Sequence, residues 1–123
     1  MEYNLAESSW GQEEIDCLYK VIERGRFTMS ENVKQFEEDF ARKFSVKHAL
    51  MTSSGSTANL LGIASLFFKK EQPLQRGDEV IVPSISWATT FYPLQQYGLK
   101  LKFLDIELET LNMDVSKLEK ALT

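Results

Sequence analysis

The residues best suited to chemistry form a short polar turn, residues 51–60, with the sequence MTSSGSTANL. An apolar run before it, His48–Leu50, predicts a short buried strand, and apolar residues at helical spacing from Leu60 to Phe68 predict a helix after it. In a strand–turn–helix arrangement, the backbone N–H groups of the first helical turn have no internal partners and point toward one spot. The helix dipole makes that spot favourable for an anion.

The residue types in this turn suit a phosphate group. Gly55 permits a close approach to the backbone, and the hydroxyls of Ser54, Ser56 and Thr57 can add hydrogen bonds. The alternative is that Ser54 or Ser56 only caps the helix. A P-loop is a poor match, because the lysine that would follow the glycine turn is missing.

A second candidate group is Trp87, which follows the near-continuous apolar run Glu79–Pro83. Such a run is typical of a strand inside a parallel sheet, and ligands of these sheets bind beyond the carboxyl ends of the strands. An indole there can stack on a flat ring, although a tryptophan also commonly packs in a core. Together, the turn and the indole indicate a planar, phosphorylated ligand.

The elements that would position these groups alternate along the chain. Residues 1–10 predict an extended arm, and Pro93 prevents the helix that ends near Gly98 from starting before about Thr89. The remaining predicted elements are helices over residues 12–23 (ended by Gly25), 30–44 and 112–122, and strands over 79–83 and 99–106. This order predicts an α/β fold, with a mostly parallel sheet and helices on both faces.

Several single residues are expected to be structural. Cys17 is predicted to be a small core residue, and His48 to be structural or exposed. The apolar stripe of the second helix is predicted to be core and consists of Val33, Phe36, Phe40 and Phe44.

Composition narrows the class of protein. The 123 residues carry a net charge of −4, and their lysines and arginines are scattered, so the sequence shows no basic patch of the kind that binds nucleic acid. One cysteine and one histidine exclude an intrachain disulfide and a Cys/His-rich metal site. The apolar runs are too short for a membrane span and no signal peptide is visible, so we expect a cytoplasmic protein.

Four blocks of sequence resemble the N-terminal part of the DegT/DnrJ/EryC1/StrS family of pyridoxal-phosphate sugar aminotransferases and their dehydratase relatives: residues 33–41, 54–61, 77–83 and 103–106. A narrower resemblance, to the family's sugar-nucleotide 3-dehydratases, lies in residues 27–29, 54–61 and 86–98. The resemblance covers essentially the whole chain. It implies part of the large domain of the aspartate-aminotransferase fold (fold type I).

The resemblance also implies roles for individual residues. Gly55, Ser56 and Thr57 would bind the phosphate of pyridoxal or pyridoxamine 5'-phosphate, and Trp87 would stack on its pyridine ring. The connector around Phe27 and Met29 would lie near a nucleotide-sugar substrate. Asp105 is expected to cap or pair locally.

The implied activity is 3-dehydration of a GDP-4-keto-6-deoxy sugar in deoxysugar biosynthesis. The alternatives are a sugar-nucleotide 4-aminotransferase of the perosamine-forming type and a silent fragment that binds or oligomerises. Family members are considerably longer, and their catalytic His or Lys comes later in the chain. We therefore expect residues 1–123 to be the N-terminal portion of the cofactor-binding domain, divided into an arm with a helix (1–30) and an α/β segment (31–123). Alone, this portion should be inactive and should self-associate, as a homodimer or a larger assembly.

Overall fold

The computed structural model describes residue 4 and residues 6–123. It divides the chain into two units, Met1–Met51 and Thr52–Thr123, and each is described by itself. The predicted arm over residues 1–10 lies partly outside the described residues, and its residues 6–10 have no regular secondary structure.

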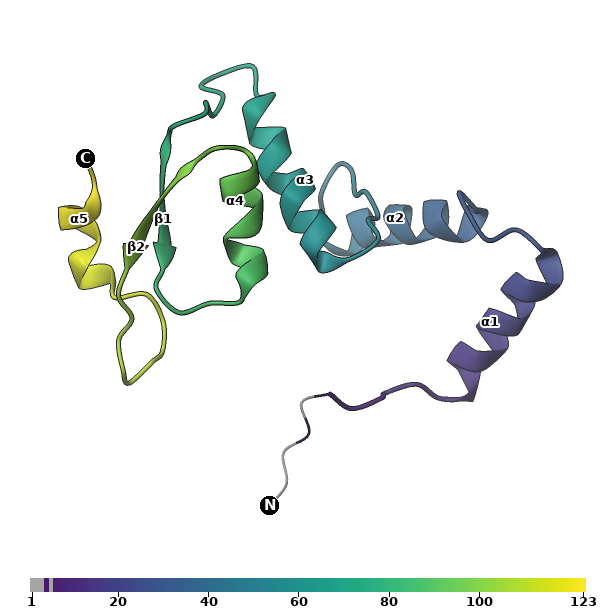
Figure 1. The fold of residues 1–123 in the computed structure, drawn as a ribbon. Helices are drawn as coiled ribbons and strands as arrows, with labels where there is room; N and C mark the ends of the chain where they lie inside the picture. The colour runs from purple at the N-terminus through teal and green to yellow at the C-terminus, as the bar shows by residue number, and fades with distance from the viewer. Residues whose placement is uncertain (1–3, 5) are drawn as a thin grey trace. The chain divides into compact units, whose positions relative to one another are not determined.

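The first unit contains two helices, α1 (Gln12–Arg24) and α2 (Glu31–Lys43) (Figure 1). Gly25 ends α1 in the left-handed conformation, with φ 65°, and its N–H donates to the carbonyl of Ile22. At the other end, the Gly11 N–H donates to the Glu14 carboxylate at 2.7 Å and lowers its pKa. The two helices predicted over residues 12–23 and 30–44 are therefore confirmed.

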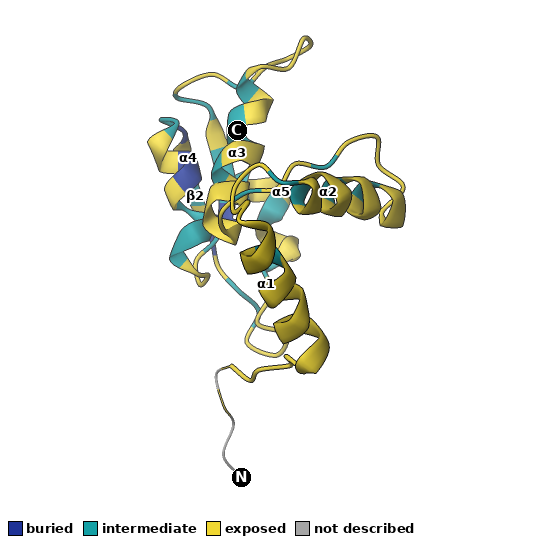
Figure 2. Cartoon of the chain, turned by 90° about the vertical axis from the view of Figure 1, so that its right-hand side faces the viewer, coloured by how far each residue is buried: buried dark blue, intermediate teal, exposed yellow. Residues whose placement is uncertain are grey.

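The apolar faces of these helices are not buried, which corrects two predictions (Figure 2). Cys17 is exposed, and Phe36 and Phe40 keep 49% and 42% of their surface exposed. The three phenylalanines of α2 contact one another along the helix, with ring centroids 5.7 and 4.5 Å apart. A periodic stripe becomes core only where another element covers it, and no described element of this unit does so.

The predicted strand over His48–Leu50 is also wrong. These residues have no regular structure, and Leu50 is 70% exposed. The next N–H, that of Met51, donates to the Glu37 side chain at 2.8 Å. A strand requires a neighbour that supplies hydrogen-bond partners, and the described residues provide none for this run.

The second unit is built around two parallel strands, β1 (Glu79–Pro83) and β2 (Lys100–Leu104), in the register Glu79↔Lys100 to Pro83↔Leu104. Helices α3 (Gly55–Phe67) and α4 (Tyr92–Gln96) lie on one face of the sheet, and α5 (Leu118–Ala121) lies on the other (Figure 1). The core lies under α3 and α4 and consists of Val82, Leu94 and Leu99, with Ile63, Phe67, Leu74, Val80, Phe91 and Leu101 packed against it. This arrangement confirms the predicted α/β class.

The crossover from β1 to β2 begins with a 3-10 turn, η1 (Ala88–Thr90), and continues into α4. Pro93 is the second residue of α4, where its missing N–H costs no helical hydrogen bond. The helix thus starts after Thr89, as predicted.

The last predicted helix, residues 112–122, is shorter than expected. It consists of a 3-10 turn, η2 (Val115–Lys117), followed by α5. Met113 pairs with Ile106 in an isolated antiparallel bridge, and the Asp114 N–H donates to the carbonyl of Asp105. Because the backbone before residue 115 is engaged in this way, it cannot join a helix.

Candidate functional site

The polar turn folds into the first turn of α3, and its hydroxyls divide into two groups. Ser54 is the N-cap: its Oγ accepts from the Thr57 N–H at 3.2 Å, and the Ser54 N–H donates to Thr57 Oγ1 at 3.0 Å. The Thr57 hydroxyl also donates to the Ser54 carbonyl at 2.8 Å. Ser54 and Thr57 therefore stabilise the turn itself, and Ser54 rather than Ser56 is the capping residue.

Two adjacent backbone donors remain at the start of α3. Among the described residues, the N–H groups of Gly55 and Ser56 have no hydrogen-bond partner, and neither has the Ser56 hydroxyl. A methyl group added at Gly55 would meet no other part of the chain within 4 Å. The helix end thus presents two N–H groups and one hydroxyl to open space, which fits an anion such as a phosphate.

Trp87 lies between β1 and η1, where its carbonyl accepts from the Thr90 N–H at 2.9 Å. The neighbouring Ser86 and Thr90 hydroxyls form a hydrogen bond of 2.8 Å, which stabilises the same turn. The tryptophan itself is 79% exposed, so it does not pack in the core of the described residues. Its indole is available to a flat ligand.

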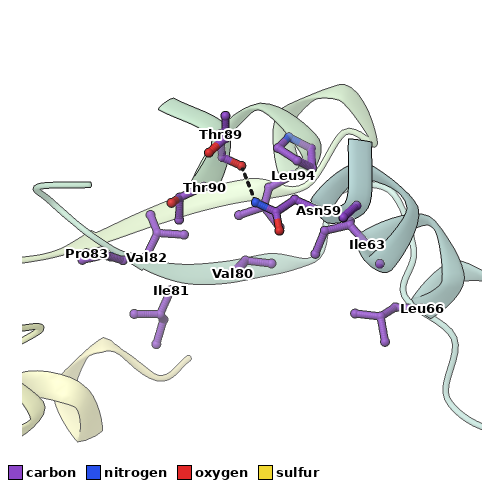
Figure 3. A pocket seen from close by; sticks show the side chains of 13 residues that line it. Asn59, Ile63, Leu66, Val80, Ile81, Val82, Pro83, Thr89, Thr90 and Leu94 are labelled. Atoms are coloured by element: carbon purple, nitrogen blue, oxygen red, sulfur yellow. Dashed lines mark hydrogen bonds between the residues drawn. The ribbon is translucent and has the colours of Figure 1, made fainter. Parts of the chain in front are cut away.

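The structure brings the polar turn and the segment after Trp87 to one place. A cavity of about 140 Å³ is bordered by Ser56 and Thr57 of α3, by Thr89 of η1 and by Tyr92 and Gln96 of α4. One hydrogen bond joins the two segments: Asn59 Nδ2 donates to the Thr89 carbonyl at 3.3 Å (Figure 3). Trp87 itself does not border this cavity, so a shared site for the turn and the indole stays a prediction.

A larger cavity, of about 460 Å³, lies next to this hydrogen bond. It runs between α3 and β1, and side chains such as Ile63, Leu66 and Val80 give it an apolar lining (Figure 3). Thr89 borders both cavities. The contact between α3 and η1 therefore lies beside two open cavities.

The other predicted residues lie elsewhere in the chain. Phe27 and Met29 belong to the first unit, in the connector between α1 and α2, and are 68% and 89% exposed; their place near a substrate stays a prediction. Asp105 accepts from the N–H of Ile106 at 2.9 Å, in agreement with a local role. His48 is exposed.

The sequence did not predict the role of Asn59 in this contact. A signal for it exists in Pro93, which has no N–H. Pro93 lies at the start of α4, and no backbone N–H of the described residues donates to the carbonyl of Thr89. That carbonyl needs another partner, and Asn59 supplies it.

Comparison with known proteins assigns the chain to a family. The family model of the DegT/DnrJ/EryC1/StrS aminotransferases matches residues 8–123. The chain belongs to the DegT/DnrJ/EryC1/StrS aminotransferase family. The predicted resemblance is confirmed.

Within the DegT/DnrJ/EryC1/StrS family, the chain is 53% identical over all its 123 residues to a GDP-4-keto-6-deoxy-D-mannose 3-dehydratase from Yersinia pseudotuberculosis, of which it covers 31%. The solved Escherichia coli GDP-4-keto-6-deoxy-D-mannose-3-dehydratase with bound hydrated PLP is 54% identical, with a TM-score of 0.91 over 99% of this chain and 31% of that one. A mutant GDP-4-keto-6-deoxymannose-3-dehydratase solved with bound GDP-perosamine gives a TM-score of 0.90, 54% identity and coverage of 99% and 32%. The chain thus spans about a third of the length of these relatives.

These neighbours confirm the predicted fold, which is that of the PLP-dependent aminotransferases. Within the described part of the chain, no helix is long and apolar enough to cross a membrane. The same described residues contain no group of three or more His, Cys, Asp or Glu that could hold a metal ion.

Proposed function

We propose that this chain is the N-terminal part of a sugar-nucleotide 3-dehydratase that uses pyridoxal or pyridoxamine phosphate. Its substrate would be a GDP-4-keto-6-deoxy sugar, in a route to deoxysugars. The observation that carries this proposal is the 53–54% identity to GDP-4-keto-6-deoxymannose 3-dehydratases along the entire chain.

The residues at the start of α3 fit the phosphate group of such a cofactor. The N–H groups of Gly55 and Ser56 and the Ser56 hydroxyl would hold the phosphate, because these donors are free and face open space. Thr57 would contribute indirectly, by fixing the conformation of the turn, because its hydroxyl already donates to the Ser54 carbonyl. This refines the sequence prediction for Thr57.

The exposed indole of Trp87 would hold the pyridine ring by stacking. Bound between these two elements, the cofactor supplies an electron sink for bond cleavage in the sugar. The chain's own residues bind it and fix its orientation. Phe27 and Met29, exposed in their connector, would contribute contacts to the nucleotide sugar.

A sugar-nucleotide 4-aminotransferase is the second candidate. The family's description as aminotransferases favours it. Under either assignment we propose a homodimeric, cytoplasmic enzyme, and the exposed apolar helix faces of the first unit support the self-association.

The full-length protein decides between these candidates by the mass of its product. We would incubate it with GDP-4-keto-6-deoxymannose, pyridoxal phosphate and glutamate, and omit the cofactor as a control. A 3-dehydratase gives a sugar that lacks the 3-hydroxyl, whereas an aminotransferase gives a 4-amino sugar. We expect the deoxy product. A cofactor-dependent amino sugar would replace the proposal by the second candidate, and unchanged substrate would contradict both.

A further inference from the structure

We propose that Asn59 is a positioning residue that sets the separation between the phosphate-binding turn and the stacking indole. The inference rests on the proposed function, since it concerns how the two halves of the cofactor site are held together. Asn59 lies in the second turn of α3, and the residue it contacts, Thr89, comes two positions after Trp87.

The acceptor of this hydrogen bond is a carbonyl that the helix cannot satisfy. In a continuous helix, the carbonyl of residue 89 would accept from the N–H of residue 93. Residue 93 is proline and has no N–H, and among the described residues no other backbone N–H donates to the Thr89 carbonyl. Asn59 Nδ2 lies 3.3 Å from it, across 30 residues of sequence (Figure 3).

The position of η1 is tied to that of Trp87. The Thr90 N–H donates to the Trp87 carbonyl at 2.9 Å, and the hydroxyls of Thr90 and Ser86 are 2.8 Å apart. A shift of Thr89 would therefore carry the backbone of Trp87 with it. At its other end, Asn59 is fixed by α3, whose first turn presents the N–H groups of Gly55 and Ser56.

The apolar contacts that join α3 to α4 lie further along the helix than Asn59, at Ile63 and Phe67, which pack against the cluster that contains Leu94. Thr89 borders two cavities, of about 140 Å³ and about 460 Å³. Among the described residues, the Asn59–Thr89 contact is the one side-chain hydrogen bond between α3 and the segment from Ser84 to Gln96. This bond is therefore the specific polar contact that couples the position of η1 to that of α3.

A double-mutant cycle in the full-length protein separates positioning from a general structural role. The substitutions are Asn59→Leu, which keeps the approximate shape and removes the donor, and Trp87→Ala. The measured quantity is the dissociation constant for pyridoxal phosphate. Gln95→Met is the matched control, because Gln95 is an exposed amide on α4 that borders neither cavity. If leucine perturbs the fold, as judged by circular dichroism, Asn59→Ala takes its place.

We expect Asn59→Leu to raise the dissociation constant about fivefold when Trp87 is present, and less than about twofold in the Trp87→Ala background. Gln95→Met should leave it unchanged in both. If Trp87→Ala weakens binding but the effect of Asn59→Leu is absent or the same in both backgrounds, the positioning role is wrong and the proposed function stands. If Trp87→Ala has no effect on binding, the stacking role fails and the inference fails with it.

Discussion

At the scale of single residues, the site depends on which donors the polar turn leaves free. The sequence showed that the turn could bind a phosphate, because small residues and hydroxyls precede a helix. It could not show which hydroxyl would cap the helix, since that depends on the backbone angles of Ser54. In the structure, Ser54 and Thr57 form the cap, and the N–H groups of Gly55 and Ser56 have no partner among the described residues.

The first prediction concerns Gly55. Changing Gly55→Ala should raise the dissociation constant for pyridoxal phosphate about tenfold, because a methyl group would occupy the space in front of the two free N–H groups. The fold should tolerate it, since beyond the adjoining residues and the backbone of its own helix that methyl meets nothing within 4 Å. Calorimetric titration and thermal unfolding measure the two effects.

Gly62→Ala is the control for this experiment. It makes the same change in the same helix, away from the first turn, and a methyl there also meets nothing within 4 Å. It should stabilise the helix by roughly 0.5–1 kcal/mol and leave cofactor affinity unchanged. Equal affinity losses in the two variants would show that Gly55 has no special place in the site.

The second prediction concerns Trp87. Because its indole is 79% exposed, Trp87→Ala should change the free energy of unfolding by less than about 0.5 kcal/mol. Loss of stacking on the cofactor ring should nevertheless weaken binding about tenfold, and Trp87→Phe should recover part of that loss. A large loss of stability with unchanged affinity would instead make Trp87 a structural residue.

At the scale of elements, the sequence predicted those whose signals are local. The run from Glu79 to Pro83 forms β1 with the predicted bounds, and Gly25 ends α1 as expected. The strand at His48–Leu50 failed because a strand exists only with a hydrogen-bonding neighbour, which lies outside the run itself. The helix over 112–122 was shortened by the Ile106–Met113 bridge, a contact that no local pattern reveals.

The third prediction concerns the start of η2. Asp114 accepts from the Ser116 N–H at 3.1 Å and pairs with Lys117 at 2.9 Å, so Asp114→Ala should increase hydrogen exchange in residues 115–121. Gln95→Ala is the control and should leave exchange in this segment unchanged.

The effect of Asp114→Ala on hydrogen exchange should depend on pH. The contacts with Lys117 and Ser116 lower the pKa of Asp114 from 3.8, so its stabilisation is lost as the pH falls through that lowered value. Asp114 raises the pKa of Lys117 from 10.5, so the contribution of the pair is also lost as the pH rises through that raised value. The difference between wild type and Asp114→Ala should therefore be full between about pH 4 and 10 and shrink outside this range. A difference that does not shrink as the pH is lowered below 3.8 would contradict this account.

At the scale of the whole molecule, much of the apolar surface is exposed to solvent. The only buried hydrophobic side chains among the described residues are Val82, Leu94, Leu99 and Leu104, all in the second unit. The first unit keeps apolar helix faces exposed, including Leu18 (48%) and Phe40 (42%). Apolar patches of this kind mark surfaces that other protein covers.

The fourth prediction follows from this surface. A polypeptide of residues 1–123 should sediment as oligomers at micromolar concentration, and the pair Leu18→Glu and Phe40→Glu should shift it toward monomer. The control pair, Gln12→Glu and Asn32→Asp, adds the same charge to the polar first turns of α1 and α2. It should leave the oligomers unchanged. A monodisperse wild-type monomer would contradict the prediction.

The central claim is that the start of α3 and the indole of Trp87 hold one flat phosphate ester between them. Titration of the full-length protein with pyridoxal phosphate tests it most directly, with the fluorescence of Trp87 defined as the signal lost in Trp87→Phe. We predict saturable quenching of that signal, reversed by inorganic phosphate in competition with the cofactor. Saturable binding that leaves the Trp87 signal unchanged and does not respond to phosphate would contradict the account.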